Sequence, residues 1–256
     1  MKHLFSVADK TVLISGGSRG IGLMIARGFV ENGANVYISS RKKETCDAAA
    51  AELSAYGRCT SLPADLGEEV EAIRLAGALR ERESRLHVLV NNAGTNWAAP
   101  LADYPDSAWD KVFALNIKSI FHLTRHCLPL LEAAVAPGDP ARVINIGSID
   151  GLHVPPMETY AYSTSKAGVH HLTRVLAKQL AARKITVNAV APGPFPSKMM
   201  KETLDNFGDM IVASVPLSRI GEPEDMAGVA IYLASRAGAY LTGAVIPVDG
   251  GMSTCL

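Results

Sequence analysis

Two patterns of apolar and polar residues alternate along the chain. Short, almost continuous apolar runs occur at 11–15, 35–40, 60–63, 88–91, 142–147, 186–190 and 244–248. Longer segments between them, among them 20–32, 68–83, 107–132 and 163–182, repeat apolar residues with a helical period. Apolar strands separated by helices are typical of a parallel sheet covered on both faces. We therefore predict an α/β fold, a Rossmann-type doubly wound parallel sheet of about seven strands.

Composition narrows the class of protein. No repeat, low-complexity tract or linker divides the 256 residues, so we expect a single domain over 1–256. Lys and Arg (25) balance Asp and Glu (25), which does not favour a nucleic acid or an anionic membrane as partner. The sequence has no apolar run long enough for a membrane span or a signal peptide, and its four cysteines form no Cys-x-x-Cys pair. We expect a cytoplasmic protein with reduced thiols.

A glycine-rich loop follows the first strand. It reads Gly16-Gly-Ser-Arg-Gly-Ile-Gly22 and leads into a predicted helix. Such glycines let backbone N–H groups approach a pyrophosphate at a helix N-terminus, where the dipole favours anions. The alternative is an ordinary structural turn. From this loop we assign cofactor contacts to Gly16, Ser18, Arg19, Gly20, Ile21 and Gly22.

The second strand ends in Ser40-Arg41, without an acidic residue for a ribose 2′-hydroxyl. An arginine at this place suits a 2′-phosphate, and Arg19 can close on the same group. We therefore predict NADP(H) as cofactor, the alternative being two ordinary surface arginines. Asp65-Leu66 follows the third strand, where Asp65 either accepts from the adenine amino group or caps a helix. Asn92-Ala93-Gly94 follows the fourth strand and lets the backbone approach the adenosine ribose.

The candidate catalytic residues are Asn116, Ser148, Tyr162 and Lys166. Tyr162 and Lys166 are four apart, so they share one side of a helix, and we expect the lysine charge to lower the pKa of the tyrosine. Tyr162 is the expected proton donor, and Ser148 would hydrogen-bond the substrate oxygen. Lys166 would also hold the nicotinamide ribose. Asn116 would hold a water molecule that links Lys166 to solvent. Tyr160 is a rival, but its partner four residues on is Thr164, which carries no charge.

Together these motifs resemble the classical short-chain dehydrogenases/reductases over nearly the whole chain. The matching pieces are Ser15-Gly16-x3-Gly20-x-Gly22, Asn91-Asn92-Ala93-Gly94, Asn116, Ser148, Tyr162-x3-Lys166, Pro192-Gly193 and Val248-Asp249-Gly250-Gly251. Within that family the chain most resembles 3-oxoacyl-[acyl-carrier-protein] reductases, particularly the branch linked to rhamnolipid synthesis. The resemblance implies the roles given above, further cofactor contacts from Pro192, Gly193, Phe195 and Ser197, and a homotetramer.

Three departures from the family pattern stand out. Ser15 and Ser197 replace threonines but keep the hydroxyl. The stretch 131–140 lacks the basic residues that carrier-protein reductases often have before the strand bearing the catalytic serine. An acidic carrier protein would therefore find no positive charges at this stretch to dock on, so the carrier protein's role as partner stays open.

The segment 194–215, rich in Met and Phe, corresponds to the family's substrate lid. It predicts an apolar ketone, for instance a 3-oxoacyl ester, unless these residues only pack the lid on the core. We assign substrate contacts to Ser148, His153, Tyr162 and Met199.

The remaining histidines suggest no chemistry. His122 and His126 have a zinc-like spacing but lack a third ligand nearby in sequence, so we predict a structural or interface role and no metal. His170 and His171 point to different helix faces and receive no role. The sequence and the resemblance together predict an NADPH-dependent ketoreductase, with a general carbonyl reductase, an oxidative alcohol dehydrogenase or an NADP(H)-sensing regulatory protein as alternatives.

Overall fold

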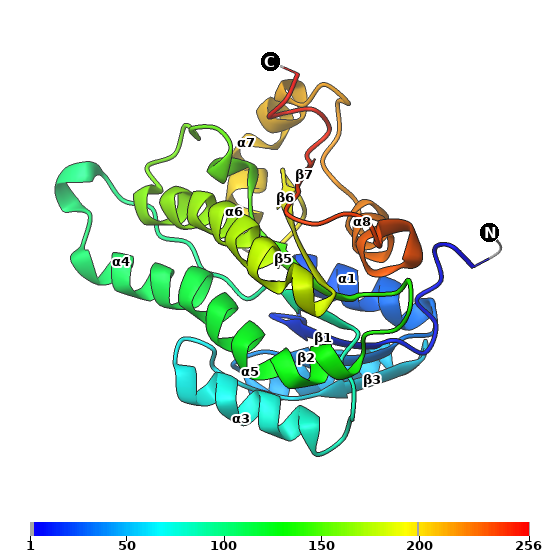
Figure 1. Cartoon of the computed structure of the whole chain (residues 1–256). Coiled ribbons are helices and arrows are strands. Elements are labelled where there is room, and N and C mark those ends of the chain that lie inside the picture. The colour runs from blue at the N-terminus through cyan, green and yellow to red at the C-terminus, as the bar shows by residue number, and fades with distance from the viewer. Residues whose placement is uncertain (1–2, 199, 256) are drawn as a thin grey trace.

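A computed structural model describes residues 3–198 and 200–255 of the chain. Its seven strands are all parallel and lie in the order β3-β2-β1-β4-β5-β6-β7 (Figure 1). They span β1 Thr11–Ser15, β2 Asn35–Ser39, β3 Arg58–Ser61, β4 Val88–Asn91, β5 Ala141–Ile146, β6 Ile185–Pro192 and β7 Val245–Val248. The predicted doubly wound parallel sheet is confirmed.

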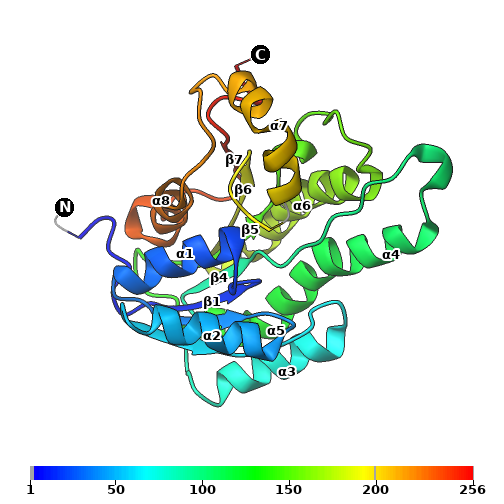
Figure 2. The same cartoon turned by 180° about the vertical axis from the view of Figure 1, so that it is seen from behind.

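Helices cover both faces of this sheet (Figures 1 and 2). They are α1 Gly20–Glu31, α2 Lys43–Leu53, α3 Glu69–Arg80, α4 Asp106–Phe113, α5 Ser119–Ala133, α6 Tyr160–Leu180, α7 Lys201–Ser214 and α8 Pro223–Ala234, with short 3₁₀ turns at Leu101–Asp103, Ile149–Gly151, Ala181–Arg183 and Arg236–Gly238. Alternate strand residues point to opposite faces. Val12 and Ile14 pack with α1, α2 and α8, whereas Leu13 packs with α3, α5 and α6.

The predicted helix 107–132 is interrupted by a wider, π-helical turn over Ala114–Lys118. Hydrophobic periodicity does not reveal one extra residue in a turn, and such turns occur often at functional sites. The helix predicted from 163 begins earlier, at Tyr160, so Tyr162 lies in its first turn. The third strand is shifted from 60–63 to Arg58–Ser61.

The predicted lid contains α7, which has no fully buried residue. Phe207 is 54% exposed and Met210 is 69% exposed. These two side chains therefore do more than pack α7 on the core, while Leu204 and Ile211 are half-buried, and the lid itself stays a prediction. Met199, assigned to the substrate, lies outside the described residues.

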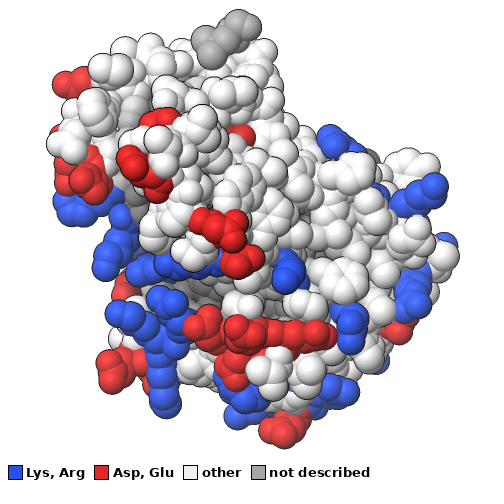
Figure 3. Space-filling view, turned by 90° about the vertical axis from the view of Figure 1, so that its left-hand side faces the viewer, with Lys and Arg blue, Asp and Glu red and all other residues white. Residues whose placement is uncertain are grey.

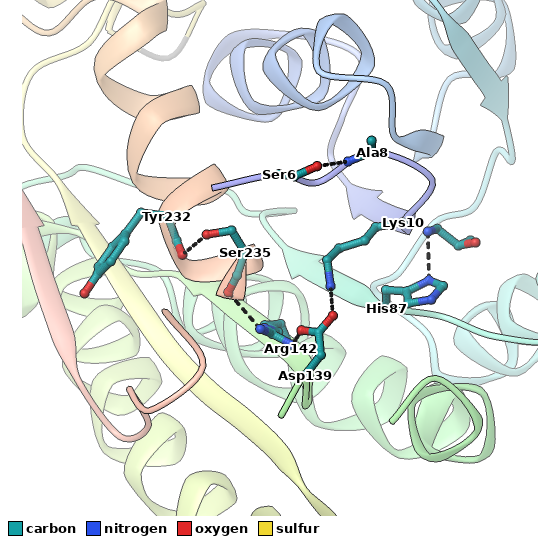
Figure 4. A network of polar contacts seen from close by, with 9 residues as sticks. Ser6, Ala8, Lys10, His87, Asp139, Arg142, Tyr232 and Ser235 are labelled. Atoms are coloured by element: carbon teal, nitrogen blue, oxygen red, sulfur yellow. Dashed lines mark hydrogen bonds and ion pairs between the residues drawn. The ribbon is translucent and has the colours of Figure 1, made fainter. Parts of the chain in front are cut away.

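An ion network ties the opposite, amino end of the sheet together (Figure 4). The Asp139 carboxylate contacts the Lys10 ammonium at 2.7 Å and the Arg142 guanidinium at 2.6 Å. Arg142 also donates to the carbonyl of Ser235 at 2.7 Å. Because Arg142 is only 1% exposed, its charge depends on these contacts rather than on water.

Candidate active site

The glycines of the loop between β1 and α1 stand where larger residues would be strained or would clash. Gly16 and Gly20 have φ values of +67° and +53°, which favour glycine. A Cβ on Gly22 would lie 2.3 Å from the carbonyl oxygen of Gly16. Arg19, at the N-cap of α1, makes no side-chain capping bond, so it does not block the amide groups of the first turn. The loop thus provides the bare helix N-terminus that a pyrophosphate requires.

Ser15 joins this loop to the end of β4. Its Oγ accepts from the backbone N–H of Asn92 at 3.0 Å and from that of Ala93 at 3.1 Å. In return, Asn92 Nδ2 donates to the carbonyls of Ser15 and Gly16, both at 3.0 Å. The sequence marked Ser15 only as a departure from Thr; the structure shows that its hydroxyl connects the end of β1 to the loop after β4.

Both arginines assigned to the 2′-phosphate are exposed. Arg41 Nε lies 3.9 Å from the Asp65 carboxylate, a distance that leaves the guanidinium largely free. Asp65 also accepts from the N–H of Gly67 at 3.3 Å, as a turn-capping residue does. Its carboxylate therefore serves a turn, while its predicted adenine contact remains a prediction. The hydroxyl of the neighbouring Ser40 is buried and has no hydrogen-bond partner among the described residues.

Ser148, Tyr162 and Lys166 meet where β5 ends and α6 begins. Ser148 is 7% exposed, and its Oγ accepts from the N–H of Asp150 at 3.1 Å. Lys166 Nζ lies 5.5 Å from the centre of the Tyr162 ring and donates to the carbonyl of Ile146 at 2.8 Å. The sheet and the helix therefore bring the three predicted side chains into one site.

The expected lowering of the Tyr162 pKa is wrong for this site. Burial raises the pKa of Tyr162 to about 12, and a hydrogen bond with Ser148 opposes this only in part. Burial also lowers the pKa of Lys166 to about 8. The lysine charge is itself disfavoured and is directed to the Ile146 carbonyl, so it does not offset the desolvation of the phenolate.

Asn116 lies in the π-helical turn and is 1% exposed. Its Nδ2 donates to the Thr95 carbonyl at 3.0 Å and to Ser165 Oγ at 2.9 Å. Its Oδ1 accepts from the N–H of Thr95 at 2.9 Å. The side chain thus connects the loop after β4 to α6. Both of its amide hydrogens are used by protein groups, so the predicted water could be held only at Oδ1 or by the backbone.

A family model described as enoyl-(acyl carrier protein) reductase matches residues 16–253 of the chain. The chain belongs to the short-chain dehydrogenase/reductase family. The rhamnolipids biosynthesis 3-oxoacyl-[acyl-carrier-protein] reductase of Pseudomonas aeruginosa is 50% identical over 253 residues, 98% of this chain and 99% of its own. A structure described as the Pseudomonas aeruginosa RhlG/NADP active-site complex matches with a TM-score of 0.96 at 50% identity, covering 99% and 100% of the two chains.

A 3-oxoacyl-[acyl-carrier-protein] reductase, FabG, of Chlamydia trachomatis is 36% identical over 250 residues, 96% of this chain and 98% of its own. The match to the family, and the resemblance to the rhamnolipid-linked branch, are thus confirmed.

In this short-chain dehydrogenase/reductase, the loop after β6 begins beside the glycine loop. A Cβ on Gly20 would lie 3.2 Å from the Ser197 Cβ. Gly193 donates to the Val248 carbonyl at 3.0 Å, which fixes the Pro192-Gly193 turn on β7. Phe195 is 2% exposed, and its ring covers Gly221, so only its backbone is available for the predicted cofactor contact.

The face onto which the carboxyl ends of the strands open is hollowed across its middle (Figure 3). Lys and Arg side chains gather toward one end of this recess and Asp and Glu line its lower edge, while the part above it is mostly uncharged. None of the helices in the described part of the chain combines the length and the apolar character needed to cross a bilayer.

The histidines outside this centre have structural contacts. His122 Nδ1 and His126 Nε2 lie 3.4 Å and 3.1 Å from one carboxylate oxygen of Glu69, so they link α5 to α3. Glu69 is distant in sequence, which is why spacing alone did not indicate it. His153, assigned to the substrate, lies beside Asp150 and Met157 in a surface groove in front of α6.

Proposed function

We propose that the chain is an NADPH-dependent ketoreductase that reduces the 3-oxo group of an acyl thioester or a similar apolar ketone to a secondary alcohol. The observation that carries the proposal is the convergence of Ser148, Tyr162 and Lys166 at the end of β5, next to a bare glycine loop. A protein that only sensed NADP(H) would need the loop but not the pair of hydroxyl groups from Ser148 and Tyr162. The 50% identity to a 3-oxoacyl-[acyl-carrier-protein] reductase supports the substrate class.

The residues present fit NADP(H). A Cβ on Gly16 would lie 2.7 Å from Asn92 Nδ2, so the loop can adopt this conformation only with glycine at this position. The exposed Arg19 and Arg41 offer two guanidiniums to a 2′-phosphate, and the unpartnered Ser40 hydroxyl lies beside Arg41. The reduced nicotinamide, when bound, supplies the hydride.

The protein residues supply the proton and the orientation. Ser148 and Tyr162 present two hydroxyl groups from neighbouring elements, so both can hydrogen-bond one carbonyl oxygen. The raised pKa keeps Tyr162 protonated at neutral pH, the form that can give a proton to the developing alkoxide. Ser148 accepts from the N–H of Asp150, and its own hydrogen, which faces the Tyr162 hydroxyl, can turn to the substrate oxygen.

The lid indicates an apolar substrate. Phe207 and Met210 on α7, and Leu152 and Met157 on the loop before α6, leave large apolar surfaces exposed around the site. Such a rim suits an acyl chain better than a sugar. The stretch 131–140 carries no Lys or Arg, so we propose a thioester substrate without requiring a carrier protein. We further propose a cytoplasmic homotetramer, as the family resemblance implies, which light scattering would test.

The deciding experiment measures initial rates of NADPH oxidation with acetoacetyl-CoA, a longer 3-oxoacyl-CoA, the matching 2-enoyl-CoA and a bulky simple ketone, each repeated with NADH. We expect the 3-oxoacyl thioesters with NADPH to be the best pair. Turnover of the 2-enoyl thioester alone would identify an enoyl reductase, and turnover of the bulky ketone alone a general carbonyl reductase. Binding of NADPH without turnover of any substrate would favour the sensor. Tyr162→Phe should bind NADPH and lose turnover.

A further inference from the structure

His170 is a buried titratable residue with no role in the mechanism above. It lies on α6, one helical turn after Lys166, and is 3% exposed. The Gly151 backbone is a nearby polar group, but neither ring nitrogen makes a well-aligned hydrogen bond within the described residues. An imidazole buried in this way costs free energy that an aliphatic side chain of similar size would not cost. A contribution to the stability of the fold therefore does not explain why a histidine stands at position 170.

The His170 ring contacts both glycines that flank the catalytic serine. A Cβ on Gly147 would lie 2.2 Å from His170 Nε2, and a Cβ on Gly151 would lie 2.9 Å from His170 Cε1. Gly151 also lies directly on the backbone of α6, where its Cβ would be 2.6 Å from the Ala167 nitrogen. The ring occupies the space in which side chains at these two positions would otherwise stand.

The serine segment is thus held by one helix at several points. Lys166 donates to the carbonyl of Ile146, two residues before Ser148, and His170 supports the residues on either side of it. Gly147 also donates to the Val190 carbonyl of β6 at 2.7 Å. Since α6 also carries Tyr162, the ring fixes the distance between the two hydroxyls that must reach one substrate oxygen.

We propose that His170 is a positioning residue for the ketone reduction: its ring, wedged between Gly147 and Gly151, sets the place of the Ser148 hydroxyl relative to Tyr162. This inference rests on the proposed function. Burial lowers the pKa of His170 to about 4, and the nearby Gly151 backbone opposes this only in part, so the ring stays neutral under ordinary assay conditions and acts through its shape rather than its charge.

The test compares His170→Leu and His170→Asn with wild type, each measured for kcat, KM, NADPH affinity and Tm. His171→Leu, a change at the exposed neighbour, is the matched control. We expect kcat to fall about ten- to a hundredfold, the scale of a misplacement of about 1 Å. NADPH affinity should stay within about twofold. The Tm of His170→Leu should be unchanged or higher, because an unpaired polar ring has been removed.

A double-mutant cycle with Ser148→Ala separates positioning of the serine from any action through Lys166. In the Ser148→Ala background, the His170 change should lower the residual kcat by less than about threefold. An equal, additive loss there would overturn the proposal, as would a folded His170→Asn or His170→Leu enzyme with the wild-type kcat. Failure of the wild type to reduce any ketone would instead contradict the proposed function.

Discussion

The Lys166 ammonium lies 5.5 Å from the centre of the Tyr162 ring, yet it hydrogen-bonds the Ile146 carbonyl at the end of β5. The lysine therefore connects the helix that carries the tyrosine to the strand that leads to Ser148. Its contribution to the tyrosine is geometric as well as electrostatic, and burial dominates the pKa values of both groups.

This relationship predicts how the reductive rate depends on pH. With its pKa at about 12, Tyr162 stays protonated in ordinary buffers and does not limit proton donation. Lys166, with its pKa lowered to about 8, loses its proton as the pH rises through that value. We expect kcat/KM for NADPH-dependent reduction to be constant from about pH 6 to 7.5 and to fall above about pH 8.

The measurement is a pH–rate profile of wild type beside Lys166→Arg, with enzyme stability checked at each pH. Arginine remains protonated throughout this range, so any activity that the variant keeps should lack the decline. A wild-type rate that stays constant to pH 10 would show that the lysine charge is not needed.

Replacing Asn116 should affect both stability and activity. Asn116→Leu removes three hydrogen bonds, one buried and two partly buried, and leaves the Thr95 N–H and carbonyl without these partners. We expect a loss of about 2–4 kcal/mol in the free energy of unfolding, since each unsatisfied buried group costs about 1–3 kcal/mol. Urea unfolding checks this, with Ser165→Ala as the milder control because it removes one of the three bonds. A loss below about 0.5 kcal/mol would contradict the structural account.

Much of this site follows from the sequence because the ends of the apolar strands can be recognised in it. Residues that follow apolar strands meet at the carboxyl edge of a parallel sheet, so Gly16, Asn92 and Ser148 could be placed together without coordinates. What the sequence does not contain is the burial of each group. The pKa of Tyr162 therefore rises where a nearby charge predicted a fall.

Contacts between residues far apart in the chain could not be predicted from the sequence either. The support of Ser148 by His170 depends on how η3, the turn Ile149–Gly151, lies against α6, and the π-helical turn at Asn116 adds one residue that no periodicity reveals. Ser15 illustrates the same limit, since its hydrogen bonds to the loop after β4 span more than seventy residues.

Arg41 should decide the preference between NADPH and NADH. Its pair with Asp65 is long and exposed, so Arg41→Ala should change stability by less than about 1 kcal/mol. A charge-assisted bond to a phosphate is worth about 1.5–3 kcal/mol, so KM for NADPH should rise roughly ten- to a hundredfold while KM for NADH changes little. Steady-state kinetics with both cofactors measure this, with Arg58→Ala, which breaks another exposed arginine pair, as control. Equal effects on the two cofactors would mean that Arg41 does not contact the 2′-phosphate.

The ion network at the amino end of the sheet predicts a separate dependence of stability on pH (Figure 4). Burial alone would raise the pKa of Asp139, but hydrogen bonds from Lys10 and Arg142 outweigh it and hold the pKa below its ordinary value. A carboxyl with a lowered folded-state pKa stabilises the fold above its unfolded pKa of about 3.9, and the contribution is lost as the pH falls through the folded value. We therefore expect acid unfolding to be partly controlled by Asp139.

Asp139→Asn tests this, because it leaves the buried Arg142 without its carboxylate. Breaking a buried pair in this way costs about 3–5 kcal/mol, whereas Glu132→Gln, which breaks an exposed pair with Arg183 at 3.0 Å, should cost less than about 1 kcal/mol. Urea unfolding between about pH 2 and 6 should show the larger loss for Asp139→Asn above about pH 4 and a weaker dependence on pH below it. Since this network lies at the end of the sheet opposite the active site, kcat of the folded variant should match wild type. Equal stability losses for the two variants would show that the Arg142 charge is compensated by the Ser235 carbonyl instead.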